Sequence, residues 1–125
     1  MSVKTLTMAD FESTILENPI VLVDFWAPWC GPCRAFTPVF ERSAQAHPDV
    51  VHAKVNTDAE RELAAVAGIR SVPTTMAFRD GVLVYSQPGA MPPAVLNDLI
   101  RQIKALDMAT SVRARIADRK AAAKT

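Results

Sequence analysis

The stretch of sequence at residues 26–33 reads Trp26-Ala27-Pro28-Trp29-Cys30-Gly31-Pro32-Cys33. It follows an apolar run, residues 20–25, that only Asp24 interrupts, and it holds the only two cysteines of the 125-residue chain. A gap of two residues at the start of a helix lets two sulfur atoms meet across one turn. Unpaired N–H groups and the helix dipole at such an N-terminus stabilise a thiolate and lower its pKa below the free value of about 8.5. The spacing therefore predicts a redox-active dithiol in which Cys30 is the nucleophile.

These eight residues match the W-A-x-W-C-G-P-C pattern of the thioredoxin family, and the chain resembles that family over roughly residues 4–106. The other segments that carry the resemblance are Val23-Asp24-Phe25, Ala53-Lys54-Val55-Asn56, Gly68-Ile69-Arg70-Ser71-Val72-Pro73-Thr74, Gly81 and Gly89-Ala90. The resemblance implies a thioredoxin fold of the α/β class, with a central mixed β-sheet flanked by helices and a C-terminal helical extension. We expect a thioredoxin domain over residues 1–108 and a basic C-terminal tail, helical or frayed, over residues 109–125.

Hydrophobic periodicity predicts an order of elements that agrees with this fold. Residues 20–26 are almost continuously apolar, which is typical of a central strand covered on both faces. Further strands are expected at residues 3–6, 50–56, 75–78 and 82–85, and an Asp80-Gly81 turn should join the last two in a hairpin. A first helix is expected after Thr7 as N-cap, with the apolar residues Phe11, Ile15 and Leu16 on one face. Further helices are expected at residues 33–46 and 59–67 and from 93 onward. Gly68 should end the second of these at a C′ position with positive φ, and Pro92-Pro93 leaves the last without a capping side chain.

Length, composition and charge limit the possible classes. The chain has the length of one domain and is 50% hydrophobic, enough to bury a core without disulfide staples. It shows no signal-peptide pattern and no apolar run long enough to span a bilayer, so we expect a cytoplasmic protein with no membrane partner. The net charge of +1 is unevenly distributed, because residues 1–100 carry −4 and residues 101–125 carry +5. Any electrostatic partner should therefore prefer the tail.

The resemblance also implies a mechanism. The Cys30 thiolate would attack a substrate disulfide, and Cys33 would resolve the mixed disulfide. Apolar neighbours predict a raised pKa for Asp24, which would accept the Cys33 proton, and Lys54 would modulate it. The alternative for Asp24 is a structural carboxylate paired with Lys54. No bound cofactor is expected, and the resemblance implies that an NADPH-dependent thioredoxin reductase regenerates the dithiol.

A substrate-binding surface is expected around Cys30. The family places the Val72-Pro73 loop against the cysteines with a cis peptide bond, so that the Val72 backbone can pair with an extended substrate. The residues expected to form the surface are Trp29, Gly31, Pro32, Val72, Pro73, Gly89 and Ala90. Two alternatives remain open, an ordinary trans proline at Pro73 and a strand-end turn at Gly89.

A zinc site is a competing interpretation of the cysteines. Cys30, Cys33, His47 and His52 fit a C-x2-C-x13-H-x4-H spacing. However, the intervening segment is predicted to be helical, and a rise of about 1.5 Å per residue would carry His47 away from Cys30. We therefore expect no metal site.

The tail supports a second alternative, a non-catalytic thioredoxin-like module that recruits a partner. Val112 and Ile116 lie four residues apart among basic side chains, as in an amphipathic helix. A sparse charged helix is marginal in water, so the sequence favours a solvated, fraying extension. Disulfide-containing proteins and thioredoxin reductase are the expected partners of a monomer, and nucleic acid is not expected to bind.

Overall fold

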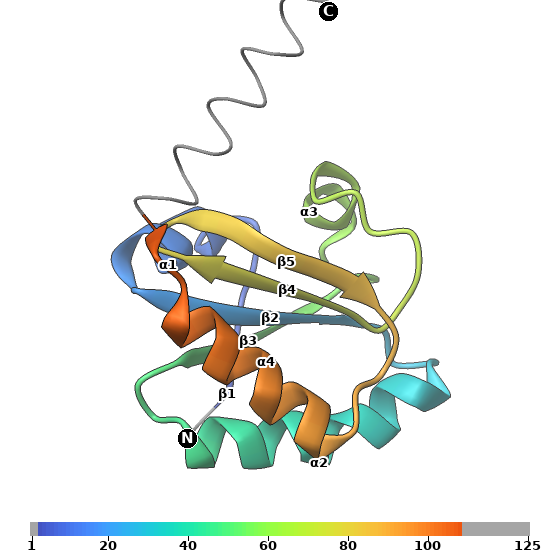
Figure 1. Cartoon of the computed structure of the whole chain (residues 1–125). Helices are drawn as coiled ribbons and strands as arrows, with labels where there is room; N and C mark the ends of the chain where they lie inside the picture. The colour runs from blue at the N-terminus through green and yellow to red at the C-terminus, as the bar shows by residue number, and fades with distance from the viewer. Residues whose placement is uncertain (1–2, 109–125) are drawn as a thin grey trace, which may run out of the picture.

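The computed structural model describes residues 3–108, whose five strands form one mixed sheet in the order β1-β3-β2-β4-β5 (Figure 1). The strands are β1 (Val3–Thr5), β2 (Ile20–Trp26), β3 (Val51–Asn56), β4 (Thr74–Arg79) and β5 (Val82–Pro88). The helices are α1 (Phe11–Glu17), α2 (Gly31–Ala46), α3 (Arg61–Val66) and α4 (Pro93–Ala105). Strands β1, β3 and β2 are parallel, whereas β4 is antiparallel to both β2 and β5. The predicted fold class and the central position of β2 are therefore confirmed. The expected tail, residues 109–125, lies outside the described residues.

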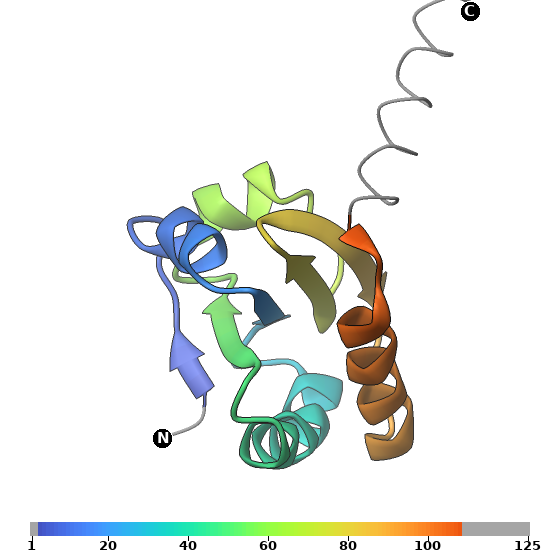
Figure 2. The ribbon, with the colours of Figure 1, turned by 60° about the vertical axis from the view of Figure 1, so that its left-hand side comes forward.

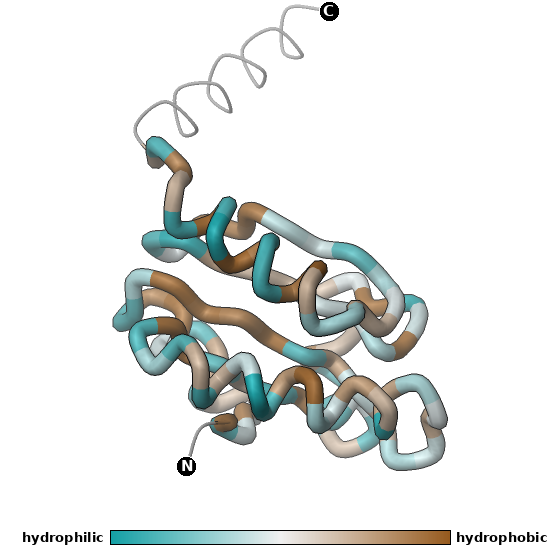
Figure 3. Tube along the Cα trace, turned by 60° about the horizontal axis from the view of Figure 1, so that its bottom comes forward, coloured by the Kyte–Doolittle hydropathy of each residue, from teal (hydrophilic) through white to brown (hydrophobic). Residues whose placement is uncertain are grey.

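Helices cover the sheet on both faces, with α1 and α3 on one side and α2 and α4 on the other (Figures 1 and 2). Side chains alternate along β2, so Val21, Val23 and Phe25 pack with α1 and α3, and Ile20 and Leu22 pack with α2 and α4. Figure 3 shows the hydrophobic run of β2 in brown between helices whose residues alternate between brown and teal. Because Asp24 and Trp26 share the face of Ile20 and Leu22, they lie on the side of α2.

Residues with positive φ angles form the turn between β4 and β5 and end helix α3. Asp80 and Gly81 have φ angles of 51° and 80°, as a two-residue type I′ hairpin requires. Gly68, with a φ of 72°, ends α3, and the next residue, Ile69, donates its N–H to the carbonyl of Ala64 at 3.0 Å. Both the predicted hairpin and the predicted glycine at the end of α3 are confirmed.

Two expectations for the first helix are wrong. Helix α1 begins at Phe11 rather than just after Thr7. Thr7 opens a preceding turn, in which the Asp10 carboxylate accepts the Thr7 N–H at 2.7 Å. Leu16 does not join the core, because its side chain is 64% exposed. Adjacent residues of a helix point about 100° apart, so Ile15 is buried against the core while Leu16 lies at the edge of that face.

The other helices follow their sequence patterns closely. Helix α2 runs continuously from Gly31 to Ala46, with Pro38 inside it. Helix α4 buries Leu96, Ile100 and Ile103. It begins at Pro92-Pro93, and within residues 3–108 no side chain caps its N-terminus, as the sequence predicts. None of the helices within residues 3–108 combines the length and the hydrophobicity that a membrane span needs.

Candidate active site

The two cysteines form a disulfide where β2 gives way to α2. Cys30 is the N-cap of α2, and Pro32 occupies the first turn, where a missing N–H costs no hydrogen bond. The Cα atoms of Cys30 and Cys33 are 5.3 Å apart, and the Cys33 N–H donates to Cys30 Sγ at 3.2 Å. Both cysteines are at least 96% buried. The sulfurs therefore meet across one helical turn, and Cys30 Sγ lies at the positive end of the helix.

The loop before β4 lies against this disulfide. The Val72–Pro73 peptide bond is cis, as expected. The carbonyl oxygen of Val72 is 3.6 Å from Cys30 Sγ, and Pro73 is buried. Gly89 donates its N–H to the Pro73 carbonyl at 2.8 Å, and its φ of 102° suits glycine. The structure thus brings Val72 next to Cys30 and joins Gly89 to Pro73, the residue that follows Val72.

Several residues of the expected substrate-binding surface are exposed. Trp29 is 68% exposed, although its neighbour Cys30 is buried. Its indole N–H donates to the Asp58 carboxylate at 3.4 Å, a partner that the sequence analysis missed. Gly31, Pro32 and Ala90 are also exposed. No sequence signal links Trp29 to Asp58, because the two residues are far apart in the chain.

Asp24 is buried on the α2 side of β2, with 4% of its surface exposed. Burial raises the pKa of its carboxyl group from 3.8 to about 7, and the positive charge of Lys54 opposes that rise. Lys54 is the neighbour of Asp24 in the register of β2 and β3, and its Nζ lies 5.6 Å from the centre of the Trp26 ring. The ion pairs found within residues 3–108 do not include one between Asp24 and Lys54.

A small pocket of about 200 Å³ connects Asp24 to α2. Its polar lining comes from Asp24, Trp26, Thr37, Glu41 and Lys54. Within the described part of the chain, Asp24 Oδ1 and Trp26 Nε1 have no hydrogen-bond partner. The Thr37 hydroxyl donates to the carbonyl of Cys33 at 3.0 Å, so the pocket reaches the turn of α2 that follows Cys33.

The sequence analysis also missed Thr37 and Glu41. A signal for them existed, because Cys33, Thr37 and Glu41 are spaced four residues apart and therefore share one face of a helix. That face of α2 points toward Asp24 and Lys54 on the sheet.

Comparison with known proteins agrees with this geometry. The family model described as thioredoxin matches residues 2–102. This chain belongs to the thioredoxin family. It is 50% identical over 118 residues to a Streptomyces coelicolor protein provisionally named thioredoxin 2, covering 94% of this chain and 87% of that one. It is also 50% identical over 97 residues to thioredoxin 1 of Synechococcus elongatus, covering 76% and 91%.

Solved structures give the same answer. A mutant thioredoxin from Halobacterium salinarum matches with a TM-score of 0.79 and 34% identity, covering 84% of this chain and 93% of that one. Thioredoxin of Plasmodium falciparum matches with a TM-score of 0.74 and 35% identity, covering 79% and 97%. Like other thioredoxins, the protein is a thiol-disulfide oxidoreductase that reduces protein disulfides through its Cys30–Cys33 pair.

The two histidines of the zinc pattern lie away from the thioredoxin disulfide. His47 is the C-cap of α2, at the opposite end of that helix from Cys30, and its Nε2 is 2.8 Å from Asn97 Oδ1. His52 is buried in β3, with its ring nitrogens at 2.9 Å from Ser43 Oγ and 3.0 Å from the Val50 carbonyl. Across residues 3–108, no three His, Cys, Asp or Glu side chains converge as metal ligands would.

Proposed function

We propose that Cys30 is the attacking thiol of this protein-disulfide reductase. The observation that carries the proposal is the position of Cys30 Sγ, which receives the Cys33 N–H at the N-terminus of α2. In the dithiol form, the same N–H and the helix dipole stabilise a Cys30 thiolate. That thiolate attacks one sulfur of a substrate disulfide, forms the Cys30–substrate bond and releases the other sulfur as a thiolate.

Cys33 resolves the mixed disulfide with the help of Asp24. The Cys33 thiol gives its proton to the Asp24 carboxylate, and the resulting thiolate attacks Cys30 Sγ. The Cys30–Cys33 disulfide forms, and the substrate, having gained two electrons, leaves with two thiolates that take up protons from solvent. A carboxylate whose pKa is about 7 is well matched to this transfer near neutral pH. Asp24 then loses its proton on the side of the pocket, where Lys54 limits the rise of its pKa.

The substrate docks on the exposed rim around Cys30. Trp29 supplies a large apolar face, and the Val72 backbone is near enough to Cys30 to align an extended substrate strand. The residues that we assign to this surface are Trp29, Gly31, Pro32, Val72, Pro73, Gly89 and Ala90. The glycines among them permit close approach of the substrate backbone.

The cellular setting follows from the same chemistry. The cycle leaves Cys30 and Cys33 oxidised, so a reductant must restore the dithiol. Membership of the thioredoxin family supports an NADPH-dependent thioredoxin reductase in this role and a mechanism that needs no bound cofactor. We assign the protein to electron transport and redox homeostasis in the cytoplasm, as a monomer whose catalytic domain spans residues 1–108. Residues 109–125 form an accessory tail.

The decisive experiment measures reduction of a disulfide-containing protein under a limiting dithiol donor. Wild-type protein should accelerate the reaction above the donor background, and Cys30→Ser should remove the acceleration. A chelator-treated sample serves as a control for metal and should react like the untreated protein. An unaccelerated reaction with wild-type protein would contradict the proposal and favour a non-catalytic module.

A further inference from the structure

Exposed apolar side chains gather in one groove on the face of the sheet opposite α2 and α4. The groove has a volume of about 460 Å³ and lies among α1, α3, β4 and the start of β5. Six large hydrophobic side chains are exposed within residues 3–108, and four of them line this groove. They are Met8 (44% exposed), Leu16 (64%), Val66 (73%) and Leu83 (38%). The groove therefore offers apolar surface that further apolar side chains would cover.

The groove reaches the β4–β5 turn. Leu16 of α1 lies close to Gly81, because a Cβ placed on that glycine would be 3.2 Å from Leu16 Cδ2. Gly81 and Leu83, from the turn and the start of β5, line the groove together with Val66 of α3. Figure 1 shows α1 and α3 flanking this part of the sheet. The floor is hydrophobic as well, with Met76 and Phe78 of β4.

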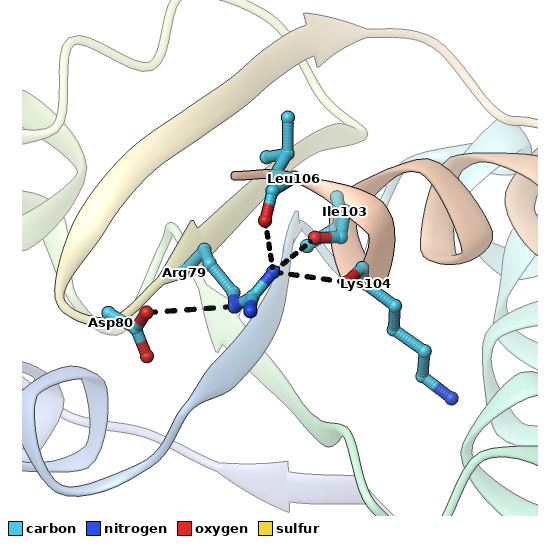
Figure 4. A network of polar contacts seen from close by, with 5 residues as sticks. All are labelled: Arg79, Asp80, Ile103, Lys104 and Leu106. Atoms are coloured by element: carbon cyan, nitrogen blue, oxygen red, sulfur yellow. Dashed lines mark hydrogen bonds and ion pairs between the residues drawn. The ribbon is translucent and has the colours of Figure 1, made fainter. Parts of the chain in front are cut away.

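The described chain ends beside the same turn. Arg79 Nη1 donates to the carbonyl oxygens of Ile103, Lys104 and Leu106 at 2.6, 3.4 and 3.4 Å (Figure 4). These bonds hold the C-terminal end of α4 against the hairpin whose turn lines the groove. The seventeen residues that follow Met108 would span about 25 Å as a helix or about 56 Å when extended. Either length suffices to carry this segment from the hairpin into the groove.

The composition of that segment complements the groove. Residues 109–125 contain five Lys or Arg and one Asp, which gives a net charge of +4. Residues 8–17, which form one wall, contain Asp10, Glu12 and Glu17 and no basic residue, and Glu12 lines the groove itself. The two large apolar residues of the segment, Val112 and Ile116, are spaced so that both could enter one apolar site.

We propose that residues 109–125 fold back onto this groove, with Val112 and Ile116 against Leu16, Val66 and Leu83 and with the basic side chains near the acidic wall. The occupant is thus the protein's own tail, a role that lies beyond disulfide reduction. Sequence alone favours a solvated extension because it shows no surface for the two apolar residues to contact. The groove supplies that surface.

The test compares two full-length variants by the amide NMR signals of Leu16, Val66 and Gly81. Val112→Asp/Ile116→Asp should shift these signals relative to wild type. Ala114→Asp/Ala121→Asp adds the same charge without removing a large apolar residue, and it should leave them nearly unchanged. Unaltered groove signals in the first variant would overturn the proposal. Wild-type signals that change with protein concentration would also overturn it, since they would indicate a second copy in the groove.

Hydrogen exchange of the tail tests the same contact with substitutions placed in the groove. Docking should slow amide exchange of residues 112–116 by at least about tenfold relative to an unstructured chain. Leu16→Gln should abolish this protection, whereas Val95→Gln, on exposed α4 surface outside the groove, should preserve it. Exchange at unstructured-chain rates in the wild-type protein would refute the docking. Disulfide reduction should be unaffected by all four variants, so its outcome is separate from that of the docking.

Discussion

Replacing Asp24 with asparagine should stabilise the oxidised protein, and the gain should grow as the pH rises. Folding raises the pKa of this carboxyl from 3.8 to about 7 because it is buried. Between these two values the folded protein keeps a proton that the unfolded chain has lost. Stability of the wild type therefore falls as the pH rises through this window, by about 1.4 kcal/mol for each pH unit. Above pH 7 the accumulated cost is about 4 kcal/mol.

An asparagine side chain at this position would resemble the protonated carboxyl in shape and cannot ionise. We therefore expect Asp24→Asn and wild type to have similar free energies of unfolding near pH 4. The variant should be more stable by about 4 kcal/mol near pH 8. The assay is reversible denaturant unfolding of the oxidised proteins at several pH values. Burial also lowers the pKa of His52, which makes stability rise with pH below 6.5. The difference between the two proteins removes that contribution.

Asp49→Asn is the matched control. Asp49 is an exposed carboxylate that accepts a hydrogen bond from Lys104, with 2.8 Å between Oδ2 and Nζ. That hydrogen bond lowers the pKa of Asp49. Its contribution to stability should therefore be lost only as the pH falls below the ordinary range of a carboxyl. Between pH 5 and 8 the difference between Asp49→Asn and wild type should stay constant. If the Asp24→Asn difference were equally constant, the raised pKa of Asp24 would be refuted, together with its assignment as a proton acceptor near neutral pH.

Three further changes test other parts of the structure. Cys33→Ser should leave the Cys30 mixed disulfide unresolved, so that mass spectrometry detects a covalent complex with the substrate; rapid turnover without that complex would exclude Cys33 as the resolving thiol. Arg79→Met should lower the free energy of unfolding by about 2 kcal/mol, because it removes charged hydrogen bonds to carbonyls at the end of α4; an unchanged denaturation midpoint would show that these bonds contribute nothing. Gly89→Ala should cost about 1–2 kcal/mol in the same assay, since its φ of 102° is unfavourable for a side chain although the space is open; equal stability would mean that the backbone relaxes there.

The sequence predicted the strand with a nearly continuous run of apolar residues and the turns that contain glycine. The apolar run of β2 identified a central strand because both of its faces are covered. The Asp80-Gly81 turn and Gly68 were predictable because few residues adopt positive φ without strain. Cis geometry at Pro73 required the resemblance to the thioredoxin family, since spacing alone favours a trans peptide bond.

Features that depend on the packing of separate segments could not be predicted in this way. Leu16 has the spacing of a core residue, but its exposure depends on what lies opposite it in the folded protein. Contact between Trp29 and Asp58 likewise joins two loops that no local pattern relates. The pocket between Asp24 and Glu41 requires α2 to cross β2 and β3 at one particular position.

The same packing explains how the buried Asp24 carboxyl, which destabilises the folded protein above neutral pH, is accommodated at the site. Leu22 and Val23 precede Asp24 on a strand with no exposed residue before Trp26, so a carboxyl at this position must either lose its charge or find a partner. Lys54 is close enough to Asp24 to lower its pKa, but the ion pairs of residues 3–108 include none between the two that would fix the charge. A firm pair would hold Asp24 ionised and make it a weaker base toward a thiol. The instability predicted above pH 7 and the proton transfer that we propose from Cys33 therefore have one physical origin, and a substitution that removes the first should also slow the second.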